Sequence, residues 1–136
     1  QNKVQFKVFL PPYELKTYTL NSTIGLTLFH AVSKSNEYSL ANRFFDYMHH
    51  AVPQLCMNFP EYGKINGEFE IALLLDDPTT SEAIAQALNK LVNNAEYYQQ
   101  LQQNCLAARE KYCWQNEEKV LLKVYEQVFA NKNGNN

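Results

Sequence analysis

The amino-acid sequence predicts an α/β domain with a mostly parallel sheet of about four strands, helices on both faces of that sheet and a helical C-terminal third. Two apolar, β-prone runs, TIGLTLF at 23–29 and FEIALLL at 69–75, have the length and composition of strands that are covered on both faces. Segments with helical periodicity alternate with these runs, an order typical of parallel sheets. After residue 79 only helical periodicity remains.

Size and charge exclude several classes of protein. The chain has 136 residues, of which 46% are hydrophobic and 19% charged, and its formal net charge is −2. A chain of this length buries about two-thirds of its unfolded surface, so we expect one core. A nucleic-acid-binding surface would be basic, so nucleic acid is not expected as a partner. No apolar run approaches the ~20 residues of a membrane helix, and no secretion leader opens the sequence. We therefore expect a cytoplasmic protein.

The cysteine pattern agrees with this compartment. The three cysteines, Cys56, Cys105 and Cys113, are odd in number and no two of them have the spacing of a metal-binding pair. A disulfide framework and a zinc site are therefore not expected. We interpret all three as free, buried thiols in a reducing compartment.

In the first half of the chain we expect three strands separated by two helices. The helix from Leu40 to His50 carries apolar residues at helical spacing, has Ser39 as its N-cap, and ends before Pro53. The other expected elements are a strand at 4–10 that Pro11 and Pro12 end, one or two helical turns at 13–19, a strand at 23–29, a loop at 30–37 and a strand at 54–58.

In the second half we expect one more strand, at 69–75, followed by helices. Residues 59–67 form a connector with one helical turn. Thr79 and Glu82 have the spacing of a capping box, and Asn93–Asn94 breaks the helical pattern. Three apolar stripes then follow: Ile84, Leu88, Leu91 and Val92; Tyr97, Leu101, Cys105, Ala108 and Tyr112; Trp114, Leu121, Val124, Tyr125 and Val128. The polar tail 131–136 is expected to be disordered.

The loops that follow the strands are the first candidates for a ligand site. In open parallel sheets, ligands bind beyond the carboxyl ends of the strands. The loops after Leu28 and after Met57 occupy such positions. Asp76 and Asp77 also follow a strand, but they precede a proline, and we interpret them as turn residues.

The segment SLANRFFDYMHHAVP, at 39–53, resembles the signature region of GT-B-fold, retaining nucleotide-sugar glycosyltransferases. In that family a helix carrying an acid leads, through a small residue and a proline, into a strand. Here the run is Asp46 to Pro53, and the family's glycine is replaced by Ala51. Residues 4–29 look like the preceding strand-helix-strand, and residues 69–112 with YCWQNEEKVLLKVYEQVF look like the family's C-terminal part.

This resemblance implies that residues 1–130 form part of a Rossmann-like, C-terminal donor-binding domain. The implied ligand is a nucleotide-sugar, which is the substrate, and no cofactor or metal is implied. The family's diphosphate-binding arginine and lysine lie upstream, as does its acceptor domain, so we expect this chain alone to be inactive. Acceptors in cell-surface polysaccharide synthesis, a peripheral membrane contact of the full enzyme and self-association are further implications. The donor-binding residues it implies are Glu37, Ser39, Leu40, Ala41, Asn42, Arg43 and Asp46.

The chemistry of sugar transfer fits these residue types. Negative charge develops on the leaving diphosphate, and a catalyst places donors and positive charge there. The N-terminus of the predicted helix offers free N–H groups, Ser39 and Asn42 add side-chain hydrogen bonds, and Arg43 adds a charge-assisted one. The carboxylate of Asp46 can accept hydrogen bonds from both hydroxyls of a ribose. The family's second carboxylate falls at Tyr38, with Glu37 beside it.

Each of these residues also has a purely structural interpretation. Ser39 can be a plain helix cap, Arg43 a solvated or ion-paired side chain, and Asp46 a surface acid. His49 and His50 are adjacent, point to different helix faces and are not expected to be catalytic. The alternative function is a non-catalytic module that binds a nucleotide-sugar or a partner. A receiver-like signalling domain is disfavoured, because the first predicted strand ends in two prolines instead of an acidic cluster.

Overall fold

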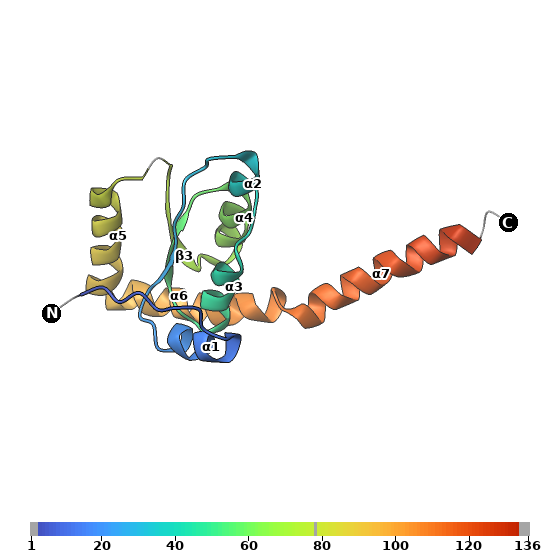
Figure 1. The fold of residues 1–136 in the computed structure, drawn as a ribbon, viewed down its shortest axis with the longest axis horizontal. Coiled ribbons are helices and arrows are strands. Elements are labelled where there is room, and N and C mark those ends of the chain that lie inside the picture. The colour runs from blue at the N-terminus through green and yellow to red at the C-terminus, as the bar shows by residue number, and fades with distance from the viewer. Residues whose placement is uncertain (1–2, 78, 134–136) are drawn as a thin grey trace.

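The computed structural model describes residues 3–77 and 79–133 (Figure 1). Its sheet is small, open and wholly parallel, with strand order β1-β2-β3. Leu26 pairs with Leu55 in the central strand, and Leu55 pairs with Leu73 on its other side. The strands are β1 (Gly25–Thr27), β2 (Gln54–Met57) and β3 (Ala72–Leu75). The chain is therefore an α/β protein that fits a Rossmann-like fold.

The described sheet has three strands, and the prediction of about four was wrong. The difference is the segment at 4–10, which contains no strand. Its apolar alternation is real, because Val4, Phe6 and Val8 occupy every second position, yet all three side chains are exposed. A strand needs a neighbouring backbone to complete its hydrogen bonds, and no described segment forms a ladder with residues 4–10.

Four helices precede β3 in the described part of the chain. The predicted helical turns at 13–19 and the predicted helix at 40–50 are both confirmed, the second with slightly shorter bounds. The predicted loop at 30–37 contains a one-turn helix, because Ser33 accepts a hydrogen bond from the backbone of Asn36 and caps it. The connector at 59–67 is a full helix opened by Pro60. The bounds are α1 (Pro12–Leu20), α2 (Lys34–Glu37), α3 (Asn42–His49) and α4 (Pro60–Phe69).

The C-terminal third is helical, as predicted. Its helices are α5 (Ser81–Asn93), α6 (Ala95–Lys111) and α7 (Trp114–Asn133). Thr80, one residue after the predicted cap, accepts the N–H of Ala83 and caps α5. The predicted break at Asn93–Asn94 is confirmed, and the Asn94 side chain caps α6. Helix α7 continues to Asn133, three residues into the predicted tail, and residues 134–136 lie outside the described residues.

Helices cover both faces of the sheet, as the sequence predicts (Figure 1). On one face, α3 and α4 pack with Cys56 and Ala72, and the aromatic side chains of Phe44 and Tyr62 fill that core. On the other face, Leu55 of β2 packs against Ala87 and Leu91 of α5. Helix α6 contributes to both cores, through Leu101 to one and through Cys105 and Ala108 to the other. The central strand β2 is consequently buried at all four of its residues.

Helix α7 differs from the others because it projects away from the domain (Figure 1). The predicted apolar stripe is present on it, but the side chains are exposed, from 44% at Leu121 to 63% at Trp114. Large apolar groups are also exposed in the N-terminal segment, with Phe6 at 95% and Phe9 at 91%. The structure thus has two exposed apolar regions, one near each end of the described chain.

Candidate functional site

The loops that follow the three strands meet at one edge of the sheet. Because β1, β2 and β3 are parallel, their carboxyl ends share this edge. His30 lies beyond β1, Asn58 directly follows β2, and Asp76 and Asp77 directly follow β3. In a unit of two parallel strands joined by a helix, the helix also begins at the carboxyl edge, which places the first turn of α3 there.

Two hydrogen-bonded pairs link the three loops. Asp77 accepts from Nδ1 of His30 at 2.8 Å and from the backbone N–H of Ala31 at 3.3 Å, while Asn58 donates to Asp76 at 2.8 Å. The hydrogen bond from His30 lowers the pKa of Asp77. The sequence interpretation of Asp76 and Asp77 as turn residues missed this role. The position of Asp76 and Asp77 could have indicated this role. They follow β3, whose carboxyl end lies at the same edge of the sheet as the loops after Leu28 and Met57.

The first turn of α3 has an open N-terminus. Its N-cap is Ala41, which forms no side-chain cap, and no acidic residue lies in the first turn. The N–H of Phe44 bonds to the carbonyl of Ala41 at 3.0 Å. The N–H groups of Asn42 and Arg43 precede the first intrahelical donor, so they and the helix dipole make this turn electropositive. The structure therefore has the kind of helix terminus that binds anions.

The predicted cap is elsewhere. Ser39 donates to the carbonyl of Asn36 at 3.2 Å and does not cap α3, so its interpretation as an N-cap was wrong. Ser39 completes the turn after α2 instead, because Asn36 is within hydrogen-bonding reach three residues back. Leu40 packs against the core beneath this turn. Glu37 is the last residue of α2 and is half-buried.

A groove runs beside α3. We call it the α3 groove, and its volume is about 780 Å³. Asn42 and Asp46 both line it, one helical turn apart, so the structure brings these two predicted residues together. Arg43 is exposed and is not among the lining residues. The groove is lined by Asn42, Phe45, Asp46, His49 and His50, together with Phe9, Leu10, Pro12, Leu15, Lys16 and Thr19 of the N-terminal segment and α1.

Asp46 faces the groove because of its position on the helix. Phe44 and Met48 are fully buried on the sheet side of α3, and Tyr47 is half-buried. Asp46 follows Phe44 by two residues, about 200° round the helix at ~100° per residue. Its side chain is exposed, and within residues 3–77 and 79–133 no hydrogen bond or ion pair engages its carboxylate. The carboxylate is therefore available to a ligand.

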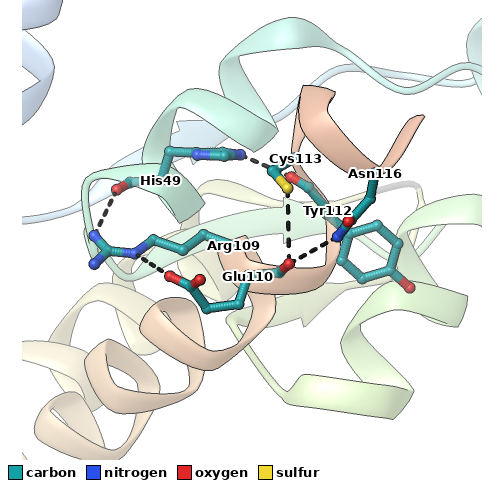
Figure 2. Close-up of polar contacts among 6 residues, drawn as sticks. All are labelled: His49, Arg109, Glu110, Tyr112, Cys113 and Asn116. Carbon is teal, nitrogen blue, oxygen red and sulfur yellow. Dashed lines mark hydrogen bonds and ion pairs between the residues drawn. The ribbon is translucent and has the colours of Figure 1, made fainter. Parts of the chain in front are cut away.

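The two histidines at the end of α3 have backbone partners. Nε2 of His49 lies 2.8 Å from the carbonyl of Tyr112, and Nδ1 of His50 lies 2.7 Å from the carbonyl of Asp46. A carbonyl only accepts, so each of these nitrogens carries a proton. Arg109 also donates to the carbonyl of His49 at 3.4 Å (Figure 2). The two bonds of His49, with Tyr112 and with Arg109, join the end of α3 to the junction of α6 and α7, whereas the bond of His50 stays within the end of α3.

Side-chain hydrogen bonds and an ion pair stabilise the junction of α6 and α7 (Figure 2). Asn116 donates to the carbonyls of Glu110 and Lys111 at 2.9 and 3.0 Å, and it thereby satisfies the end of α6. Arg109 pairs with Glu110 at 3.5 Å, and the thiol of Cys113 points to the Glu110 carbonyl at 3.7 Å. Each of these polar groups therefore has a partner within the domain, and we interpret them as structural.

The cysteines are free thiols in the structure, as predicted. Cys56 and Cys105 are buried, whereas Cys113 is partly exposed, which corrects the expectation that all three are buried. Across the described part of the chain, no three His, Cys, Asp or Glu side chains gather as a metal-binding group. No helix within residues 3–77 and 79–133 is long and apolar enough to cross a membrane.

Comparison with known proteins adds no relative, because no family model, no curated protein and no solved structure matches this chain.

Proposed function

We propose that this chain is the donor-binding part of a GT-B-type glycosyltransferase that transfers a sugar from a nucleotide-sugar to an acceptor. One observation carries the proposal: Asn42 and Asp46 line the same groove, on a helix whose first turn is open to an anion. A volume of about 780 Å³ is within the usual range for small-molecule sites.

The groove suits a nucleoside diphosphate in one orientation. The diphosphate would lie at the first turn of α3, where the backbone N–H groups of Asn42 and Arg43 favour negative charge. The ribose would lie one turn further along, where the Asp46 carboxylate accepts hydrogen bonds from its two hydroxyls. Lys16 lines the same groove from α1 and adds positive charge.

The end of α3 adds support for the resemblance to this family. Ala51 has a φ of 53°, the left-handed conformation that favours glycine. It occupies the position at which the family carries glycine before the proline. At Ala51 the backbone of this chain thus has the left-handed conformation for which glycine is the usual residue.

Sugar transfer itself requires groups beyond those in this chain. We propose that an acceptor-binding domain and upstream basic residues complete the active site, and that the whole enzyme acts in the cytoplasm, where its three thiols stay reduced. The acceptor we propose is a precursor of a cell-surface polysaccharide.

The test is nucleotide binding by the purified chain and its Asp46→Asn variant. NMR titrations with UDP, GDP and ADP, each beside its nucleoside, suit weak ligands. Asparagine keeps the shape of the side chain but weakens two charge-assisted hydrogen bonds, each worth about 1.5–3 kcal/mol. We therefore expect the affinity for the preferred nucleotide to fall by roughly tenfold or more.

A matched control separates this effect from a general loss of charge. Glu126 is exposed on α7, far along the chain from the α3 groove, and Glu126→Gln also removes one negative charge. We expect it to leave nucleotide affinity unchanged. Equal affinities for the parent chain and Asp46→Asn, or no binding of any nucleotide by the parent chain, would contradict the proposal.

A further inference from the structure

A buried tyrosine from α4 forms a hydrogen bond with the start of α3. Tyr62 lies in α4, is 0% exposed, and its hydroxyl oxygen accepts the backbone N–H of Ala41 at 2.8 Å. The two residues are 21 positions apart, so the bond joins two different elements. Ala41 is the N-cap of α3 and has no capping side chain of its own. The bond from Tyr62 is thus an external attachment point for the start of the helix.

The tyrosine ring is itself fixed. It packs edge-on against Phe44 of α3, with ring centroids 4.9 Å apart, and against Phe29, at the exit of β1, with centroids 6.1 Å apart. Aromatic rings prefer such edge-to-face contacts at these distances. The hydroxyl therefore has a defined position between the end of β1 and the start of α3.

A second buried side chain holds the same turn. Gln54 of β2 donates from Nε2 to the carbonyl of Phe44 at 3.0 Å, and its Oε1 accepts the hydroxyl of Thr27 at 2.8 Å. Gln54, Thr27 and Phe44 are all 0% exposed. The first turn of α3 is thus held through one N–H and one carbonyl, by groups from α4 and β2.

These bonds are not needed to form the helix. An α-helix satisfies its interior carbonyls within its own ladder, and the N–H of an N-cap residue takes no part in that ladder. Burying a polar side chain is unfavourable unless it is hydrogen-bonded. A tyrosine hydroxyl and a glutamine amide at these positions therefore gain little for the helix alone. What they add is a fixed orientation of its first turn relative to the sheet.

We propose that Tyr62 is a positioning residue for the diphosphate of the donor: by holding the Ala41 N–H, it aims the N–H groups of Asn42 and Arg43 at the anion. This inference rests on the function proposed above. Preorganised donors bind an anion better than donors that must reorient, because the cost of ordering has already been met in folding.

The electrostatics of the hydroxyl suit this role. A tyrosine hydroxyl is neutral at physiological pH, and burial raises the pKa of Tyr62 further. A neutral hydroxyl next to the turn does not repel a diphosphate, whereas a carboxylate at the same place would.

The test uses the whole chain and the variant Tyr62→Phe, which keeps the ring and its aromatic contacts but removes the hydroxyl. NMR titrations with UDP, GDP and ADP, each beside its nucleoside, and with pyrophosphate measure the part of the affinity that depends on phosphate. We expect the affinity for the preferred nucleoside diphosphate and for pyrophosphate to fall about three- to tenfold, as for one lost hydrogen bond. Affinity for the nucleoside should stay the same. The amide signals of Asn42 and Arg43 should shift less on addition of pyrophosphate than they do in the parent chain.

A second variant and a control accompany it. Gln54→Met removes the other buried attachment at similar volume, and we expect the same phosphate-dependent loss. Tyr98→Phe removes a hydroxyl that donates to the carbonyl of Thr23 at 2.6 Å, away from α3, and should leave binding unchanged. A selective loss in both α3 variants supports the proposal.

Other outcomes overturn it in distinguishable ways. If the parent chain binds a nucleotide and Asp46→Asn weakens it while Tyr62→Phe and Gln54→Met do not, the positioning role is wrong and the proposed function stands. An equal loss for nucleoside and nucleoside diphosphate would show general distortion of the groove, and unfolding of both variants would show a role in folding alone. If the parent chain binds none of the probes, the proposed function itself fails.

Discussion

The backbone N–H of Val52 donates to the carbonyl of Tyr47 at 2.9 Å and closes the end of α3. Within this loop, Ala51 donates to the carbonyl of Met48 at 3.1 Å and adopts a φ of 53°. The pair of bonds and the left-handed residue are those of a Schellman motif, in which that residue is usually glycine. An alanine there carries steric strain that a glycine would not.

Ala51→Gly is expected to stabilise the chain. Relief of the left-handed strain, worth about 1–2 kcal/mol, outweighs the roughly 0.5–1 kcal/mol that the greater freedom of glycine costs in the unfolded chain. The net gain in the free energy of unfolding should be about 0.5–1 kcal/mol by urea denaturation. The control is Ala107→Gly in the middle of α6, where φ is negative and glycine should cost about 1 kcal/mol. A loss of stability from Ala51→Gly would contradict this account.

Gly25→Ala is expected to destabilise the chain, because α3 lies directly over β1 at this point. A Cβ on Gly25 would come within 2.5 Å of the Tyr47 ring. Overpacking of this kind costs typically ~1–3 kcal/mol. Gly67 has no neighbour within 4 Å of an added Cβ, so Gly67→Ala in α4 should be neutral or slightly stabilising. Combining Gly25→Ala with Tyr47→Ala should cost less than the sum of the two single changes, and strict additivity would exclude a clash.

Local chemistry explains why much of the fold could be predicted from the sequence. The strand at 54–57 follows Pro53 and precedes Pro60, so its length is limited on both sides. The break between α5 and α6 falls at Asn94 because an asparagine side chain caps the next helix. The segment at 4–10 shows where such reasoning stops. Its alternation is that of a strand, but whether a strand forms depends on a partner backbone, which no local pattern specifies.

The site, like the fold, could be predicted only in part from the sequence. The outward position of Asp46 follows from helical geometry and the apolar stripe of Phe44 and Met48. The mistaken cap at Ser39 arose because a serine three residues before α3 also has an acceptor behind it, at Asn36. The contacts of Tyr62 with Ala41 and of His30 with Asp77 span 21 and 47 residues, and only the packed structure determines them.

The three thiols are expected to differ in reactivity. Burial raises the pKa of Cys56 and of Cys105 to about 12, so at pH 8 roughly one molecule in ~10⁴ carries either thiolate. Cys113 is partly exposed. A thiol reagent should therefore modify one cysteine quickly in the native chain and all three in denaturant. Cys113→Ser should abolish the fast phase, and rapid modification of more than one native thiol would show that the core is open.

The chain alone is expected to transfer no sugar. Under the proposed function, acceptor-binding groups and upstream diphosphate-binding residues lie outside this chain, and bringing two reactants together in the correct orientation supplies a large share of such a rate. Assays with several nucleotide-sugars should show background hydrolysis only. NMR spectra of the same samples provide the control that the chain is folded. Turnover above background would overturn the view that this chain is only the donor-binding part.

The chain is also expected to self-associate through its N-terminal segment. Residues 4–10 present an alternating apolar face, with Phe6 at 95% and Val8 at 86% exposure, beside backbone groups that pair with no described strand. Extended segments of this kind are templates for pairing between molecules. Sedimentation velocity over a wide range of concentrations should show oligomers that dissociate on dilution.

Substitutions within this segment can test the mechanism of association. Phe6→Ser and Val8→Ser together should shift the distribution towards monomer, because they remove the apolar face but keep the backbone. Gln5→Ser, next to Phe6 in the sequence, removes no apolar group and should not shift it. Association that survives Phe6→Ser and Val8→Ser would point to the other exposed apolar surface, the stripe on α7 from Trp114 to Val128. A monomer at high concentration that also fails to bind an apolar dye would contradict the prediction, because neither surface would then be adhesive.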